Sequence, residues 1–413
     1  MTKINFLTQI LMIIFNQTNI LAFNNFITIV MEQVGPRLSY WEYEIYFKDV
    51  DVFVIGSGIV GLSTAISIKE KNPLLKIVIL ERGALPMGAS TRNAGFACYG
   101  SMTELIEDVK RDGEDMMLEL VKRRFEGLEL LKKRIAPEKM NFRHQGGFEI
   151  FRSDDMESYE ECLANIPYYN KLVEPITGLK NTYTIADHQI ESFGFKGINH
   201  MILNQGEGEL DTGLMMEELI LLANKLNIRI INGINIESYE SSAAGITLLT
   251  DKNWELKSKK LVIATNGFSK NLLPNIEVTS ARNQVLVTDP IDGLKLKGCF
   301  HYDRGYFYFR EINNRILIGG GRNLAAKAET TDSFGINNMI QSALSQLLRT
   351  TVIPYTTFEI DRRWSGILGL GPVKKPIIEK IDENVVVAVR MGGMGVAIGS
   401  LVGSEAADLV LEA

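Results

Sequence analysis

A glycine-rich turn between two apolar segments constrains the fold of this chain more than any other feature. Residues 52–55 have the composition of a buried parallel strand, and the sequence Gly-Ser-Gly-Ile-Val-Gly at residues 56–61 then opens a segment with helical character. A second apolar segment, residues 76–80, ends at Glu81, twenty positions after the last of these glycines. This succession of strand, glycines, helix, strand and terminal acid predicts a unit that binds a dinucleotide.

Each part of this unit has a physical role. The first glycine allows a tight turn, the second lets the backbone approach a pyrophosphate, and the third lets the helix pack close to the strand. Backbone amides and the positive end of the helix stabilise the phosphate charge. The carboxylate of Glu81 is placed to bind the ribose hydroxyls of an adenosine. The alternative is a glycine-rich turn from strand to helix that binds no ligand.

Composition excludes several other classes of protein. A chain of 413 residues, 46% of them hydrophobic, is large enough for two or three domains with sizeable cores. The net charge of −6, without a long basic run, argues against a nucleic-acid partner. Cys98, Cys162 and Cys299 form no CxxC pair and the four histidines no HxH or HExxH motif, so we expect neither disulfides nor a metal site. This cysteine usage suits a reducing, cytoplasmic location.

The first thirty residues are apolar but repeatedly interrupted. They contain no apolar stretch of 18 residues, so we expect no stable membrane span. Lys3 before an apolar core is typical of a signal peptide, but a convincing cleavage site is missing. We favour Met31 as the true start, because dinucleotide-binding domains usually begin near the start of a chain. Residues 1–49 are therefore assigned to an N-terminal extension and lead-in.

The pattern of the remaining segments predicts an α/β fold with two sheets. Residues 260–265 and 385–390 are apolar strands of the parallel type, and both end in glycine-containing turns, where a doubly wound sheet places its ligands. Residues 276–289, 305–310 and 315–319 have the pattern of antiparallel strands. We therefore expect a discontinuous Rossmann-like nucleotide-binding domain with an inserted α+β substrate domain built on an antiparallel sheet. The ranges are 50–140, 211–274 and 355–413 for the first domain, and 141–210 and 275–354 for the second.

Two further segments have recognisable secondary-structure patterns. Residues 212–226 predict an amphipathic helix, entered at Asp211. Four short strand signals follow, at residues 228–231, 234–239, 246–249 and 254–256, and we interpret them as a small meander that ends in the strand at 260–265.

Four segments together resemble the FAD-dependent oxidoreductases of the D-amino-acid oxidase, glycine oxidase and sarcosine oxidase superfamily. They are the turn at 56–61 with Glu81-Arg82, the loop Gly-Ala-Ser-Thr-Arg-Asn-Ala-Gly at 88–95, Ala-Thr-Asn-Gly at 264–267, and Arg-Trp-Ser-Gly at 363–366 with Met-Gly-Gly-Met-Gly at 391–395. The resemblance covers about residues 50–413. The second and fourth segments most resemble the bacterial amine-oxidising branch, which includes gamma-glutamylputrescine oxidase.

The resemblance implies FAD in an extended pose. Residues 90–93 would line the pyrophosphate and flavin, Ile236 would contact adenine through its backbone, and residues 393–395 would point amides at the N1–C2=O edge of the flavin. A helix N-terminus there can stabilise the negative charge that hydride transfer places near N1. The implied cofactor-binding residues are Gly56, Gly58, Ile59, Val60, Gly61, Glu81, Arg82, Ala89, Ser90, Thr91, Arg92, Asn93, Ala94, Ile236, Thr265, Asn266, Gly267, Gly366, Gly393, Met394, Gly395 and Val396.

Departures from the family concern the flavin linkage and the substrate. The stretch after Gly366, where sarcosine oxidase bonds its flavin through a cysteine, has no Cys, and residues 85–100 have no His. We therefore expect non-covalent FAD, and Cys98 is expected to be a small buried apolar residue. Glycine oxidase binds the substrate carboxylate with an arginine where this chain has Leu368, which puts an amino-acid substrate held in that way in doubt.

The substrate-pocket candidates are Tyr306, Tyr308, Arg310 and Trp364. The tyrosines alternate with phenylalanines on a predicted strand and could form an aromatic cage for a cation, or simply pack as a half-buried strand. Arg282, Arg310 and Arg322 could each bind a carboxylate, although surface or structural ion pairs are the alternative.

The leading hypothesis is oxidation of a C–N bond in a small amine or amino acid. Hydride would pass to the flavin N5, the imine would hydrolyse, and dioxygen or an electron carrier would accept the electrons. The family implies that no general base is required. One alternative is oxidation of a C–O bond in a hydroxyacid or similar substrate, which needs a base, usually His. His301 precedes the predicted hairpin and is expected to be a solvated turn residue. A flavoprotein without turnover is the other alternative.

Overall fold

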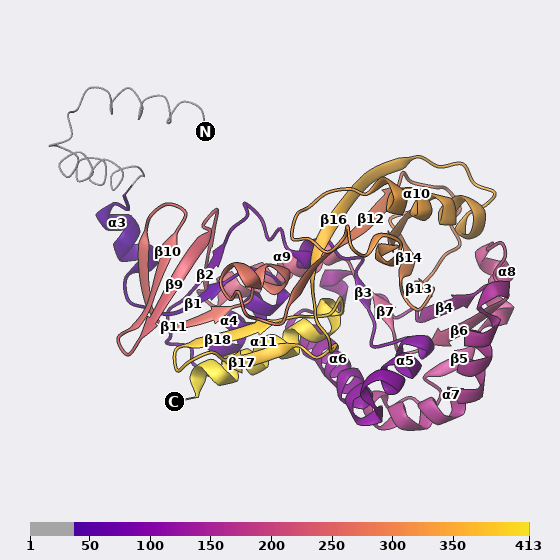
Figure 1. Ribbon diagram of the computed structural model, residues 1–413, viewed down its shortest axis with the longest axis horizontal. Coiled ribbons are helices and arrows are strands. Elements are labelled where there is room, and N and C mark those ends of the chain that lie inside the picture. Colours follow the sequence, from indigo (N-terminus) through magenta and orange to yellow (C-terminus); the bar gives the residue numbers. More distant parts are fainter. Residues whose placement is uncertain (1–36, 413) are drawn as a thin grey trace, which may run out of the picture.

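The computed structural model describes residues 37–412 and contains two eight-stranded sheets (Figure 1). The first sheet has the strand order β17 (Ile377–Lys380), β18 (Val385–Val389), β11 (Glu255–Ile263), β1 (Val50–Ile55), β2 (Ile77–Glu81) and β8 (Arg229–Asn232), with β10 (Gly245–Thr250) and β9 (Ile236–Ser242) attached to β11. The second has the order β16 (Ile360–Leu370), β12 (Thr279–Thr288), β15 (Arg315–Gly320), β14 (Phe307–Ile312), β13 (Cys299–Tyr302), β4 (Gly147–Phe151), β6 (His200–Asn204) and β5 (Tyr183–Ile185).

The helices lie around both sheets. They are α3 (Tyr40–Glu42), α4 (Ile59–Lys71), α5 (Met102–Asp112), α6 (Glu114–Arg134), α7 (Met156–Thr177), α8 (Ile190–Phe193), α9 (Thr212–Lys225), α10 (Asn338–Leu347) and α11 (Gly395–Leu411). A two-stranded ladder of β3 (Phe96–Ala97) and β7 (Gly208–Glu209) lies between the two sheets (Figure 1). The predicted α/β class, with a Rossmann-like sheet and a separate, mainly antiparallel one, is confirmed.

The first sheet is buried on both faces. Its strands β8, β2, β1, β11 and β18 pair in parallel. In β1, Val52 and Val54 pack into the core formed with α4, α6, α9 and α11, whereas Phe53 and Ile55 pack against the β9–β10 hairpin on the other face. Because alternate side chains of a strand point to opposite faces, the apolar residues of β1 are buried on both faces of the sheet.

Glycines bring α4 close to both β1 and α11. A Cβ at Gly61 would lie 1.9 Å from the carbonyl oxygen of Gly56, so only glycine allows α4 to start this near the strand. A Cβ at Gly399 would lie 2.7 Å from the side chain of Ile59, and one at Gly403 would lie 2.5 Å from Ser63. The first turns of α4 and α11 are therefore packed side by side on one face of the sheet.

The predicted four-strand meander is partly wrong. The signal at 228–231 corresponds to β8, which pairs in parallel with β2 at the edge of the first sheet. The helix α9 is the crossover that parallel pairing requires. The predicted strands at 254–256 and 260–265 form one continuous strand, β11, and only β9, β10 and β11 make an antiparallel meander.

The second sheet has its own core. The rings of Phe300, Phe148 and Phe309 stack on neighbouring strands, and Ile340 and Leu344 of α10 pack over them. The strand β16 pairs with β12 here, although its residues fall in the range assigned to the nucleotide-binding domain. The domain boundaries stay a prediction.

The predicted start at Met31 and the apolar segment before it lie outside the described residues. Within residues 37–412, no helix combines the length and hydropathy that crossing a membrane requires.

Candidate active site

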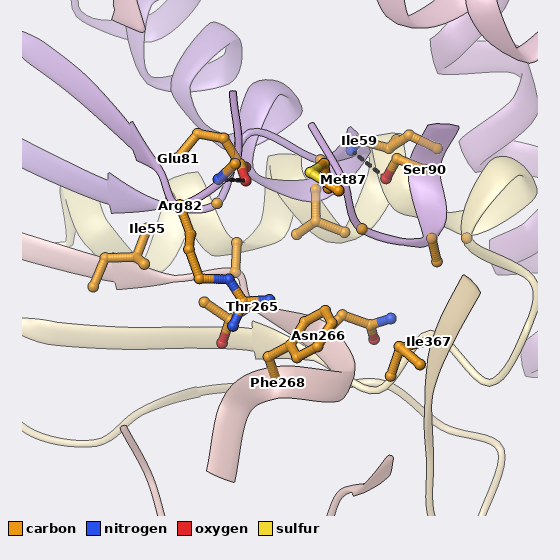
Figure 2. A pocket seen from close by; sticks show the side chains of 18 of the residues that line it. Ile55, Ile59, Glu81, Arg82, Met87, Ser90, Thr265, Asn266, Phe268 and Ile367 are labelled. Atoms are coloured by element: carbon orange, nitrogen blue, oxygen red, sulfur yellow. Dashed lines mark hydrogen bonds between the residues drawn. The ribbon is translucent and has the colours of Figure 1, made fainter. Parts of the chain in front are cut away.

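A cavity of about 460 Å³ lies at the carboxyl ends of β1, β2 and β11. Glu81 and Arg82, at and just after the end of β2, lie across it from Thr265, Asn266 and Phe268, which follow β11 (Figure 2). The Arg82 guanidinium lies 4.4 Å from the centroid of the Phe268 ring. This is the crevice where a parallel sheet of this type binds its ligand.

The start of α4 is exposed to this cavity. Gly58 is the N-cap and provides no side chain to cap the helix. The Ile59 amide donates a hydrogen bond to the Ser90 hydroxyl at 3.0 Å (Figure 2). First-turn amides lack partners within the helix and carry its positive dipole end. This part of the cavity is therefore suited to a phosphate group.

The carboxylate of Glu81 is fixed at the other end of the turn. Its Oε2 accepts hydrogen bonds from the Ser57 amide (3.0 Å) and hydroxyl (2.8 Å), and its Oε1 accepts one from the Gly83 amide (2.8 Å). A carboxylate offers about four acceptor positions. Glu81 therefore keeps capacity for at least one hydroxyl donor from a ligand.

The cavity also contains polar atoms and open space that fit a bound dinucleotide. The hydroxyl of Thr265 is buried and has no hydrogen-bond partner among the described residues. A Cβ added at Gly88 or Gly393 would meet no protein atom within 4 Å. A helix start for a pyrophosphate, a carboxylate for a ribose and an unpaired hydroxyl together match the groups of FAD.

Most of the predicted cofactor-binding residues border this cavity. They are Gly56, Gly58, Ile59, Val60, Glu81, Arg82, Ala89, Ser90, Asn93, Ile236, Thr265, Asn266, Gly393, Gly395 and Val396. Arg92, Ala94, Gly366 and Met394 border a second cavity instead. Gly61, Thr91 and Gly267 border neither. Gly61 and Gly267 are packed against backbone carbonyls, and the Thr91 hydroxyl donates to the Pro86 carbonyl.

The second cavity, of about 450 Å³, shares a wall with the first. The shared residues are Ala89, Asn93, Leu368, Gly393 and Val396. Val396 lies in the first turn of α11, Gly393 directly precedes the N-cap Met394, and Met394 makes no side-chain cap. The amides of this helix start therefore lie where the two cavities meet.

Two of the four substrate-pocket candidates line the second cavity. Tyr306 and Tyr308 border it, whereas Phe307 and Phe309 are buried in the core of the second sheet. The Tyr308 hydroxyl accepts a hydrogen bond from Asn283 Nδ2 at 2.9 Å, and burial raises its pKa well above the usual value.

Arg310 and Trp364 border neither cavity. Arg310 is buried and donates from Nη2 to the carbonyl oxygen of Leu210 at 2.9 Å. Trp364 donates from Nε1 to the carbonyl oxygen of Arg92 at 3.0 Å. The tryptophan therefore holds the loop at 88–95 in place.

The other two candidates for carboxylate binding, Arg282 and Arg322, have different surroundings. Arg282 forms a two-pronged ion pair with Glu329, with both distances 2.9 Å, and lies outside both cavities. Arg322 borders the second cavity and makes no ion pair or side-chain hydrogen bond within residues 37–412. Arg92 has no carboxylate partner there either, and donates to the Ser365 carbonyl at 2.9 Å.

The remaining charged groups that border this cavity have partners of opposite charge. The pairs are Glu104 with Arg124 and Lys374, Glu107 with Arg304, Arg111 with Asp108 and Asp112, and His301 with Glu207. The guanidinium groups of Arg322 and Arg92, which pair with no carboxylate of residues 37–412, thus leave the cavity with an excess of positive charge.

The expectation for His301 is wrong. His301 lies in β13, a strand absent from the prediction, and borders the second cavity instead of a solvated turn. Its Nε2 lies 3.7 Å from both Glu207 Oε2 and Cys98 Sγ. Burial lowers the pKa of His301, but the nearby carboxylate of Glu207 outweighs it, and the net pKa is raised. Cys98 is buried as expected.

The sequence model of the FAD dependent oxidoreductase family (DAO) matches residues 51–409. The chain belongs to this family. It is therefore an FAD-dependent oxidoreductase, as its sequence motifs predicted.

Two related sequences and a solved structure are similar to most of this chain. The chain is 24% identical to a probable oxidoreductase, OrdL, of Haemophilus influenzae over 386 residues, which cover 88% of this chain and 83% of the relative. It is 25% identical to the gamma-glutamylputrescine oxidoreductase of Escherichia coli, with 87% and 83% covered. Glycine oxidase from Bacillus cereus has the same fold, with a TM-score of 0.71, 17% identity and coverage of 88% and 97%.

Proposed function

We propose that this DAO family protein oxidises a C–N bond of a small amine or amino acid, with FAD in the first cavity and the substrate in the second. The observation that carries the proposal is the shared wall at the start of α11. The amides at this helix start would stabilise negative charge on an FAD held in the first cavity, and a substrate in the second cavity would lie next to that cofactor. Relatives named as a gamma-glutamylputrescine oxidoreductase and as glycine oxidase support an amine or amino-acid substrate.

FAD, when bound, accepts the hydride from the substrate. The protein supplies binding and orientation. The helix starts of α4 and α11 would hold the pyrophosphate and the flavin and would stabilise their negative charge. Tyr306 and Tyr308 form one side of the substrate cavity, and the Asn283 hydrogen bond fixes the hydroxyl of Tyr308.

The charge balance of the second cavity favours a substrate with an anionic group. Arg322 has no partner among the described residues, and the other charged groups on the wall are either paired or, for Arg92, engaged by a carbonyl. A guanidinium binds a carboxylate well through paired hydrogen bonds. Arg322 would therefore bind the substrate carboxylate, which glycine oxidase binds with an arginine at the position of Leu368.

We propose that the FAD is held without a covalent bond. None of the cysteines or histidines among residues 37–412 borders the first cavity. Acid precipitation should release all of the flavin into the supernatant, and flavin that stays with the precipitated chain would contradict this.

Anaerobic reduction of the bound flavin tests the function. Sarcosine, glycine and L-proline carry an amine and a carboxylate, putrescine carries amines alone, and L-lactate and glycerol 3-phosphate carry hydroxyls. We expect the visible flavin band to bleach with at least one amine and not with the hydroxyl compounds. Reoxidation by air, compared with reoxidation by an added dye, then distinguishes dioxygen from an electron carrier as acceptor.

One observation favours a second candidate. Oxidation of a C–O bond needs a base, and His301 with its carboxylate partner borders the substrate cavity. Bleaching by L-lactate or glycerol 3-phosphate, without bleaching by any amine, would establish this alternative.

A further inference from the structure

His301 and Glu207 form a pair whose geometry is fixed from behind. Glu207 is 1% exposed, and its Oε1 accepts hydrogen bonds from the amides of Tyr99 and Gly100, both at 2.9 Å. Its Oε2 faces Nε2 of His301 at 3.7 Å. The carboxylate is therefore immobile, and the imidazole lies between it and the second cavity.

One nitrogen of His301 is left for a ligand. Nε2 faces Glu207 and Cys98, whereas Nδ1 has no hydrogen-bond partner within residues 37–412. The side chain keeps 16% of its surface exposed and borders the cavity. The ring of Phe96 packs edge-on against it, with centroids 5.3 Å apart, and limits its rotation. The carboxylate of Glu207 faces one ring nitrogen of His301, and the ring borders a cavity. In this arrangement the carboxylate can orient the imidazole so that the imidazole accepts a proton.

We propose that His301, oriented by Glu207, accepts a proton from the substrate in the second cavity. The inference rests on the proposed function, because it needs a substrate there. An alkylammonium ion has no lone pair and cannot release hydride from its α-carbon. In the step, one N–H bond of the ammonium breaks, its electron pair stays on the substrate nitrogen, and the proton bonds to the imidazole. The carboxylate of Glu207 stabilises the imidazolium that forms.

The groups around His301 set the pH range of this step. The titratable or charged side chains that face it from neighbouring elements are Glu207 and Cys98 from the loops beside β7 and β3, Cys299 on its own strand, Glu149 on β4, Tyr308 on β14, and Glu104 with Lys374. Burial disfavours the imidazolium, but Glu207, Glu149 and Glu104 favour it, and the pKa is raised above its usual value. The neutral imidazole, which can accept a proton, therefore predominates only at a higher pH than in a free histidine.

Rapid-reaction measurement of flavin reduction against pH tests the proposal in the FAD-loaded enzyme. Wild type is compared with His301→Gln, Glu207→Gln and the exposed control His188→Gln, using two amines of different basicity. In wild type, the reduction rate should rise with pH through an ionisation that is the same for both amines. We expect His301→Gln to lose this ionisation and about 100-fold of rate at neutral pH. Glu207→Gln should move the ionisation to lower pH.

Several outcomes would overturn the proposal. They are a His301→Gln variant with unchanged rate and pH profile, an ionisation that follows the basicity of the amine alone, and stoichiometric zinc in the purified protein. The last matters because donor atoms of Cys98, Glu207 and His301 lie within 4.8 Å of one another, and a metal there would occupy the imidazole. Flavin content and thermal unfolding of each variant show whether it has folded.

Failure of the proposed function has a different signature. If no amine reduces the flavin at any pH, the function fails, and NMR still tests the pair directly. The chain has four histidines, so single substitutions assign their signals. His301 should titrate above 6.5 in wild type and lower in Glu207→Gln. An unchanged value in the variant would contradict the orienting role of Glu207.

Discussion

The hydroxyl of Ser90 accepts a hydrogen bond from the backbone amide of Ile59 at 3.0 Å, and this contact joins the loop at 88–95 to the first turn of α4. Ser90 and Ile59 both border the cavity assigned to FAD. The loop is thus attached to the helix start that is expected to bind the pyrophosphate.

We expect Ser90→Ala to weaken FAD binding about fivefold, which corresponds to one ordinary hydrogen bond. Fluorescence titration of apoprotein with FAD measures the change. Ser192→Ala removes an exposed hydroxyl from α8 and serves as the control. Equal FAD affinity in both variants would remove this contact from the binding site.

Glu81→Gln should weaken FAD binding by between about 10- and 100-fold, because a hydrogen bond to a charged acceptor contributes more than a neutral one. The substitution keeps the shape of the side chain, so the Ser57 contacts lose charge without opening a cavity. Titration against the exposed control Glu237→Gln measures the effect. Unchanged affinity would mean that Glu81 serves only to fix the turn.

Substitutions of two glycines in the turn at 56–61 should distinguish an effect on folding from an effect on FAD binding. Gly61→Ala would place a Cβ 1.9 Å from the Gly56 carbonyl oxygen, and we expect loss of the folded protein. Gly58→Ala would place a Cβ 2.9 Å from the Ser90 hydroxyl, a side chain that can rotate away. This variant should fold but bind FAD weakly. Circular dichroism and FAD titration of both variants test the distinction, and a stable Gly61→Ala protein would contradict it.

Acid should weaken the cluster around Glu104. Burial raises the pKa of Glu104, but Arg124 and Lys374 outweigh it and hold the pKa well below its usual range. The stabilisation is therefore present above the usual pKa of 4.5 and is lost as the pH falls through the lowered value. Arg124→Met should lower the free energy of unfolding by about 3 kcal/mol at pH 7.

The difference between Arg124→Met and wild type should shrink at pH 4, because the carboxylate of Glu104, which keeps Lys374 but loses Arg124, takes up a proton more readily in the variant. Urea unfolding at both pH values measures it, with Lys122→Met as the exposed control. A constant difference would show that the loss comes from packing or from the hydrogen bond to the Tyr99 carbonyl instead.

Arg322→Met should raise KM for a carboxylate-bearing amine such as sarcosine or L-proline by about 10- to 100-fold, with a smaller change in kcat. Putrescine, which has no carboxylate, should be unaffected or bound better. Steady-state kinetics of the variant and of the exposed control Arg362→Met check this. An equal effect on both kinds of substrate would contradict carboxylate binding by Arg322.

The first cavity could be predicted from sequence because its determinants are local. The turn at 56–61, Glu81 and the segment 391–395 each lie at the end of a strongly apolar strand, and parallel strands of one sheet bring such ends together. The partner of a short strand is not encoded locally in the same way. For this reason the signal at 228–231 could be recognised as a strand but not placed beside β2.

The second cavity was harder to predict because its wall comes from many separate segments. Strand alternation correctly put Tyr306 and Tyr308 on one face, and Arg310 follows them in the same alternation. Alternation does not predict how far a cavity extends. Arg310 lies beyond the second cavity and donates a hydrogen bond to the carbonyl oxygen of Leu210. His301 was missed because β13 has only four residues, too few for a periodic signal.

The close contact of α4 with α11 has a consequence for how the protein is made. Because α11 follows α4 in the chain by more than three hundred residues, the nascent protein carries the turn at 56–61, which we propose binds the pyrophosphate, long before it has the helix that completes both cavity walls. Cofactor that meets the growing chain finds an open half-site. With FAD in the first cavity, as we propose, its enclosure would come late in biosynthesis, when the two ends of the fold are joined.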